Sequence, residues 1–354
     1  MSLGEKFLNK SNSYRHYKDN YDKLKKENDE LKQQNDALKE IESLKKKMSK
    51  MEKKIKFQDE VLESQNDLFN LIFVQSNFKA GGLLRNIQLH SIELLKYVVN
   101  VIEKNDLTYW LDYGTLLGCI RHDGFLPWDD EIDISMPRKD YEKFVEAMKK
   151  ELENSPEINE KIRFSMGVSK LRGAKNNGTP ILSCQFIHDK PHANVDVHPL
   201  DYYDIDPNKN PDIIEEIRKD FIKSKRELTS KVLEGDYESY DEGALEVGEK
   251  FHIVYQKTDY IGSSMDGTGR RPVHVSKIYP LKKRSFEGIE VNIPNEPLTY
   301  LSAHYPGELM KLPMRVRAHN FTDYIVNNEY DGNYDLDGVY EETLAFWKSV
   351  NQND

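Results

Sequence analysis

The stretch WLDYGTLLGCIRHDGFLPWDDEIDISMPRKDY, residues 110–141, decides most of what the sequence predicts about the fold. Within it, Glu131–Ser135 alternates acidic or polar residues with apolar ones, as a strand with one functional face would. Leu107–Tyr113 predicts another strand, which Gly114 is expected to end, and Thr115–Ile120 predicts a short helix after it.

Outside this stretch, predicted helices and strands alternate along the body of the chain. Further strands are expected at Arg163–Val168, Ile181–Ile187 and Asn194–His198, a hairpin at Ser285–Ile293, and helices at 83–104, Lys139–Leu152, Pro211–Leu233 and Leu298–Met310. This order predicts an α/β (α+β) domain, a mixed sheet flanked by helices, over residues 80–325, followed by a C-terminal tail at 326–354.

The sequence before residue 80 predicts an N-terminal tail at 1–20 and a charged coiled coil at 21–65. Apolar and amide residues from Tyr21 to Leu38 follow the 4-and-3 spacing of a coiled-coil seam, and after a one-residue slip the pattern continues from Ile41 to Leu62. This pattern predicts a homo-oligomer joined through residues 21–65. A single charged helix or a frayed tail is the alternative.

Composition narrows the possible functions. The 354 residues carry a net charge of −10, but residues 1–56 contribute +6, so the remainder stands at −16 and is a poor partner for nucleic acid. No apolar run is long enough for a spanning helix, and the N-terminus has no signal-peptide core. Two cysteines cannot form a disulfide scaffold or a zinc cage. We expect a cytoplasmic protein, with the lysines around 45–47 as possible contacts to the inner membrane face.

The acidic residues of the opening stretch predict a metal site. Glu131 and Asp133 lie two apart on a predicted strand, so their Cα atoms are about 7 Å apart on one face. Such carboxylates repel unless a proton or a cation lies between them, and Mg²⁺ (or Mn²⁺) is the natural cation where phosphates are bound. Asp129 has the same parity, and Asp196, on another predicted strand, is the best candidate for a third carboxylate.

The preceding turn predicts phosphate binding. Gly114 permits close approach of a ligand to the backbone, while Thr115 offers a hydroxyl and a helix start offers free N–H groups.

The acidic cluster has an alternative interpretation, which is a solvated sheet edge without a metal. A calcium loop is not supported, because the order D-x-D-x-D-G is absent.

The same residues resemble the signature of the LicD family, the phosphocholine-transferase-like group that includes the fukutin-related proteins. The matching positions are Gly114, Thr115, Leu116, Leu117, Gly118, Arg121, His122, Pro127, Trp128, Asp129, Asp130 and Asp133. Val195–Asp201 and a C-terminal segment around FEGIEVNIP are similar to further family elements, so the resemblance covers about residues 91–325. Glu131 replaces the usual Asp, and His198 replaces the usual Phe.

The resemblance implies a nucleotidyltransferase-like fold and transfer of a phosphoalcohol, such as phosphocholine or a polyol phosphate. The donor would be a CDP-activated alcohol, the acceptor a hydroxyl of a glycan or lipid-linked glycan, and CMP would leave. Glu131, Asp133 and Asp196 would bind the metal, with Asp129 supporting them and Asp196 helping to deprotonate the acceptor.

Four cationic residues are candidates to hold the donor phosphates: Arg121, His122, Lys170 and Arg172. For Arg121 the alternative is a buried pair with Asp129 or Asp130, and for His122 a structural hydrogen bond. Two other functions remain open at this point: a coiled-coil scaffold that binds a nucleotide or glycan without turnover, and a nucleotidyltransferase acting on a small molecule.

Overall fold

The computed structural model describes residues 3–74, 78–165, 181–184, 193–206, 209, 250, 252–263, 272–305, 307–312 and 336–353. It divides into two units, Met1–Leu68 and Phe69–Asp354, which we describe separately. The predicted helix Pro211–Leu233 lies outside the described residues. No described helix contains an apolar segment long enough to cross a bilayer.

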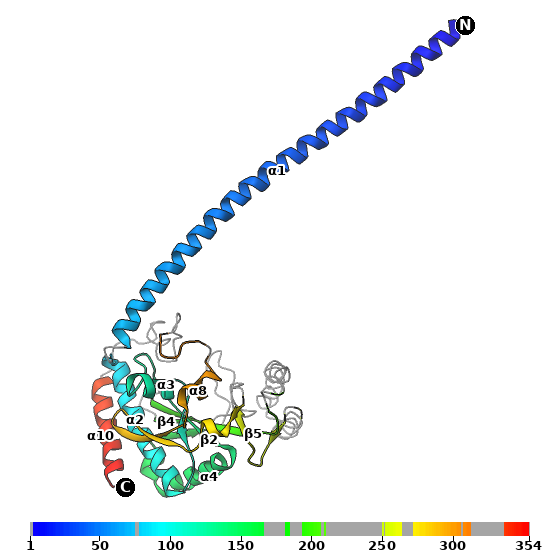
Figure 1. Cartoon of the computed structure of the whole chain (residues 1–354). Helices are drawn as coiled ribbons and strands as arrows, with labels where there is room; N and C mark the ends of the chain where they lie inside the picture. The colour runs from blue at the N-terminus through cyan, green and yellow to red at the C-terminus, as the bar shows by residue number, and fades with distance from the viewer. Residues whose placement is uncertain are drawn as a thin grey trace. The chain divides into compact units, whose positions relative to one another are not determined.

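The first unit is formed by α1, a single helix that spans Leu3–Phe73 (Figure 1). The last residues of this helix, from Phe69 on, are counted with the second unit. The helix covers the predicted coiled-coil region, and it also includes most of the residues predicted as an N-terminal tail. Its continuity follows from composition, since residues 22–56 contain neither Gly nor Pro.

The second unit is built on a mixed eight-stranded sheet with the central order β1-β2-β5-β4-β3. The strands are β1 (Trp110–Leu111), β2 (Ile132–Pro137), β3 (Ile162–Ser165), β4 (Ile181–Cys184), β5 (Ala193–Tyr203), β6 (Ile253–Val254), β7 (Tyr260–Ser263) and β8 (Val273–His274). Only β2 and β5 pair in parallel among the described strands, and β6 and β7 extend the sheet from the far end of β5. The expected mixed sheet is therefore confirmed.

Helices and a hairpin surround this sheet (Figure 1). The helices are α2 (Gly82–Lys104), α3 (Tyr113–His122), α4 (Arg138–Asn154), α5 (Pro156–Asn159), α8 (Pro297–Ser302) and α10 (Leu336–Asn353), with a 3-10 turn at Val275–Lys277. The hairpin β9 (Lys282–Phe286) and β10 (Ile289–Ile293) turns at Glu287 and Gly288, whose positive φ angles of 49° and 89° suit a tight turn.

The core forms where α2 and α4 pack against the sheet. Side chains of one parity on β2 and β5 are fully buried there, among them Ile132, Ile134 and Val197. The opposite parity carries the acidic residues, which leaves the other face of these strands for a site.

Two predicted boundaries are wrong. Gly114 does not break the chain, because the helix already begins at Tyr113, where the Asp112 carboxylate accepts from the Tyr113 N–H and caps it. The predicted tail at 326–354 contains α10, which packs against α2 with Trp347 fully buried against Tyr97. Helix α10 therefore belongs to the core of this unit.

Candidate active site

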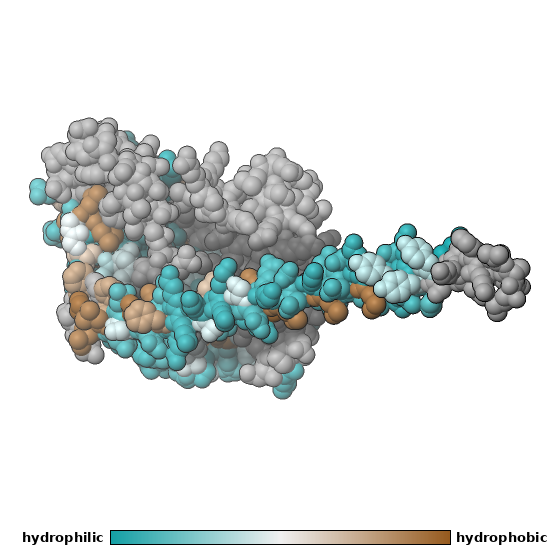
Figure 2. Space-filling model, turned by 90° about the horizontal axis from the view of Figure 1, so that it is seen from above, coloured by the Kyte–Doolittle hydropathy of each residue, from teal (hydrophilic) through white to brown (hydrophobic). Residues whose placement is uncertain are grey.

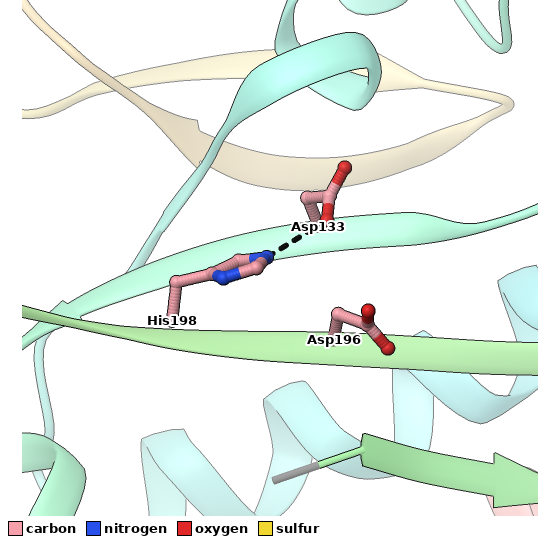
Figure 3. A group of neighbouring side chains, drawn as sticks. All are labelled: Asp133, Asp196 and His198. Carbon is pink, nitrogen blue, oxygen red and sulfur yellow. Dashed lines mark hydrogen bonds and ion pairs between the residues drawn. The ribbon is translucent and has the colours of Figure 1, made fainter. Parts of the chain in front are cut away.

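The centre of the site is a pair of carboxylates on neighbouring parallel strands. Asp133 of β2 and Asp196 of β5 are direct partners in the strand register, so their side chains leave the same face of the sheet (Figure 3). Adjacent strands lie about 4.8 Å apart, which brings the two carboxylates within reach of one ion. The structure thus brings together two of the three predicted metal ligands on adjacent strands.

A histidine completes this group. His198 lies two residues after Asp196, and its Nε2 is 2.8 Å from Oδ1 of Asp133 (Figure 3). One ligand atom from each of Asp133, Asp196 and His198 lies within 4.8 Å of the others, so the group could hold a metal ion. The sequence identified His198 only as a departure from the family pattern, although its parity with Asp196 would have placed it here.

Three ionised carboxylates this close together repel one another unless a proton or a cation lies between them. Burial is the main cause that raises the pKa of Asp196 well above its usual range, and the negative charges of Glu131 and Asp133 raise it further. His198 acts in the opposite direction. Glu131, half-buried just before β2, is therefore close enough to belong to the site electrostatically. A donor set of carboxylate oxygens and one imidazole fits a divalent cation that would relieve this repulsion.

The start of α3 holds the strand that carries Asp133. The Asp133 N–H donates to Oγ1 of Thr115 at 2.9 Å, and its carbonyl accepts from the Asp112 N–H at 2.9 Å. Thr115 is fully buried. Its hydroxyl therefore positions β2, and the predicted contact of this hydroxyl with a phosphate stays a prediction.

Gly114 is needed for a close contact inside the protein. A Cβ atom at this position would lie 2.7 Å from Oδ2 of Asp129. The carboxylate of Asp129 thus occupies the space that the sequence assigned to an approaching ligand. Asp129 is buried, its carbonyl accepts from Nε2 of Gln88 at 2.9 Å, and it is not part of the group formed by Asp133, Asp196 and His198.

A buried hydrogen-bond network around Asp112 holds the start of α3 and strand β2 together, and the sequence analysis missed it. Oδ2 of Asp112 accepts from the Tyr300 hydroxyl at 2.7 Å and from the Ser135 hydroxyl, while Oδ1 caps α3. The Trp110 indole donates to the Tyr300 hydroxyl at 3.1 Å. An Asp directly before a helix is a known capping signal, and it could have identified this residue.

Aromatic rings line the His198 side of the site. The Tyr113 ring lies 4.8 Å from the His198 ring and 4.7 Å from the His304 ring, measured between centroids. Tyr113 also has a φ of 44°, a strained value for a residue with a side chain, and such strain often occurs at functional sites. The Tyr113 ring therefore packs against the His198 imidazole on the side of the site next to α3.

The predicted cations have mixed outcomes. Arg121 is buried, which lowers its pKa to about 10, and its Nη1 donates to the carbonyls of Leu309 and Lys311 at 2.9 and 2.8 Å. These contacts join α3 to the segment after α8, and phosphate binding by Arg121 would have to use Nη2. His122 is buried beside it, 3.5 Å from Nε of Arg121. Lys170 and Arg172 lie outside the described residues.

A mixed sheet with paired carboxylates on neighbouring strands, set against the start of a helix, defines a nucleotidyltransferase-like domain. Comparison with known proteins agrees: residues 106–229 match the family model "LicD/FKTN/FKRP, nucleotidyltransferase domain". The chain is 28% identical over 251 residues to a lipopolysaccharide cholinephosphotransferase LicD of Haemophilus influenzae, covering 65% of this chain and 92% of that protein.

Shorter matches point the same way. The ribitol 5-phosphate transferases FKRP of human and mouse are each 42% identical over 48 residues, which is 14% of this chain and 10% of each of those proteins. The chain therefore carries a LicD/FKTN/FKRP nucleotidyltransferase domain and is distantly homologous to LicD and FKRP. Over this domain the chain is similar to transferases of phosphorus-containing groups.

Proposed function

We propose that this protein transfers a phosphoalcohol, such as phosphocholine or a polyol phosphate, from a CDP-activated donor to a hydroxyl of a cell-surface glycan or its precursor. The observation that carries the proposal is the register of β2 and β5, which places Asp133 opposite Asp196 with His198 beside them. The names of the relatives support the chemical class, since one is a cholinephosphotransferase and another a ribitol 5-phosphate transferase.

In the reaction, the acceptor oxygen forms a bond to the phosphorus that carries the alcohol, and the bond from this phosphorus to CMP breaks. A divalent cation, Mg²⁺ or Mn²⁺, held by Asp133, Asp196 and Glu131 together with the His198 imidazole, would neutralise charge on the pyrophosphate of the donor. Asp196 would also help to deprotonate the acceptor hydroxyl, which is the role that the family resemblance implies for it. Asp129 would hold Gly114 and the start of α3 in place.

The experiment that tests this proposal measures the nucleotide that is released. The full-length protein is incubated with Mn²⁺ or Mg²⁺ and CDP-choline, CDP-ribitol or CDP-glycerol, with water as a slow acceptor in place of the glycan. We expect CMP from at least one donor. Release of pyrophosphate from CTP and a phosphoalcohol would show a nucleotidyltransferase instead, and absence of turnover with all substrates would overturn the proposal.

The imidazole in the site predicts a metal preference. Mg²⁺ prefers oxygen ligands only, whereas Mn²⁺ accepts an imidazole nitrogen and lies within the divalent series that binds nitrogen sites. We expect the protein to bind Mn²⁺ at least about 10-fold more tightly than Mg²⁺. Replacing His198 by Phe, the residue usual in the family, should weaken Mn²⁺ binding by about 10-fold or more and leave Mg²⁺ binding less affected.

Calorimetric titration of each metal into the two proteins checks this preference without any assay of activity. His274, which lies on β8 and is exposed, provides the matched control, and His274→Phe should bind both metals as the wild type does. An unchanged ratio of Mn²⁺ to Mg²⁺ affinity in His198→Phe would show that the imidazole orients Asp133 and does not bind the metal.

A further inference from the structure

Helix α1 carries a row of large apolar side chains on its surface. Leu24, Leu31 and Leu38 expose 64%, 62% and 60% of their surface, and Met48 and Met51 are as exposed. Figure 2 shows hydrophobic side chains gathered along one side of this helix. A helix of this length with exposed leucines in a row is expected to bury them against a partner.

The spacing of these residues identifies the kind of partner. From Tyr14 to Leu38 the row follows the alternating steps of three and four that define the core positions of a coiled coil, and from Ile41 to Leu62 it follows them again. Between the two segments three steps of three follow one another, 35–38–41–44, so one heptad is a residue short, which alters the supercoil locally without ending it.

The charges beside this row test whether the partner is a second copy of the chain. In a parallel, in-register dimer, each residue just before a first core position faces the residue five positions later on the other helix. Both positions are charged in four such pairs, and all four pairs have opposite charges: Glu27 with the partner's Lys32, Glu40 with the partner's Lys45, Lys47 with the partner's Glu52, and Lys54 with the partner's Asp59.

The order of the charges makes this agreement informative. The acidic member comes first in the two N-terminal pairs and second in the two C-terminal pairs, so complementarity is kept although the signs are exchanged. Asn28 and Asn35 add a second constraint, since each occupies a first core position and meets its own copy only in a parallel, in-register pair. Buried Asn at such positions favours two strands.

We infer that α1 joins two copies of this chain in a parallel, in-register coiled coil over residues 14–62. The inference is independent of the proposed function, because none of the residues involved belongs to the candidate active site. Its consequence is that the protein works as a dimer with two catalytic domains.

Charge reversal on the full-length protein tests the inference. The wild type should sediment at twice the 41.4 kDa of one chain. Lys47→Glu with Lys54→Glu places like charges in two pairs and should weaken dimerisation by about 10-fold or more. The control, Lys46→Glu with Lys53→Glu, has the same composition but changes the outermost positions of the same heptads and should remain dimeric.

A mixing experiment separates lost pairing from misfolding. A second variant, Glu52→Lys with Asp59→Lys, should also fail to pair with itself but should form a mixed dimer with Lys47→Glu/Lys54→Glu. Leu24→Cys should form a disulfide with its own copy on oxidation, which an antiparallel pair would not allow. A monomeric wild type, equal dimerisation of the charge-reversed and control variants, or no disulfide cross-link in the oxidised Leu24→Cys variant would each overturn the inference.

Discussion

Replacing Asp133 by Asn should reduce the rate of CMP release by about 10³-fold or more without unfolding the protein. The change keeps the shape of the side chain but removes the charge from the group that Asp196 and His198 complete. The backbone N–H of residue 133 still donates to Thr115, so the strand keeps its position. Single-turnover kinetics with the best CDP-alcohol, together with a thermal unfolding curve, measure both parts of this expectation.

The matched control is Asp204→Asn, an exposed carboxylate just beyond the end of β5, the strand that carries Asp196. It has the same chemical change in the same domain and should keep the wild-type rate. If Asp133→Asn retained activity within about tenfold of the wild type, the metal site would lie elsewhere.

Replacing Asp112 by Ala should lower the free energy of unfolding by about 3–5 kcal/mol. This carboxylate is fully buried and accepts from Tyr300, Ser135 and the Tyr113 N–H. Its loss leaves these donors buried without an acceptor and removes the cap of α3. Urea unfolding at neutral pH, followed by far-ultraviolet circular dichroism, gives the difference in free energy.

The variant Tyr300→Phe measures how much one hydrogen-bond partner of the Asp112 carboxylate contributes. This variant removes one hydroxyl, which links Trp110 to Asp112, and should cost about 1–2 kcal/mol. A smaller loss for Asp112→Ala than for Tyr300→Phe would contradict the view that the carboxylate is the centre of the network.

The paired carboxylates could be predicted because their signal is local. Asp133 and Asp196 each alternate with buried aliphatic residues, so parity alone puts each on the polar face of its strand. That the two strands are neighbours in register is a tertiary fact, which the sequence analysis assumed when it chose Asp196 as the third carboxylate. His198 shares this parity, but the sequence does not show that its imidazole would reach Asp133.

The errors have a common physical cause, which is that local patterns do not show what packs against them. Asp112 resembles the continuation of an apolar strand until its carboxylate is seen to cap α3. The residues around Thr115 likewise do not show that its hydroxyl accepts from the N–H of Asp133. The helix α10 looked like a tail because its burial depends on α2, far away in the sequence.

The most direct test of the account is a crystal structure of the full-length protein with Mn²⁺ and a non-transferable CDP-alcohol analogue, in which anomalous scattering locates the metal. The account predicts one or two manganese peaks in contact with the side chains of Asp133 and Asp196 and with the analogue's phosphates. Manganese bound away from these two carboxylates, or an analogue bound with no metal beside them, would contradict it.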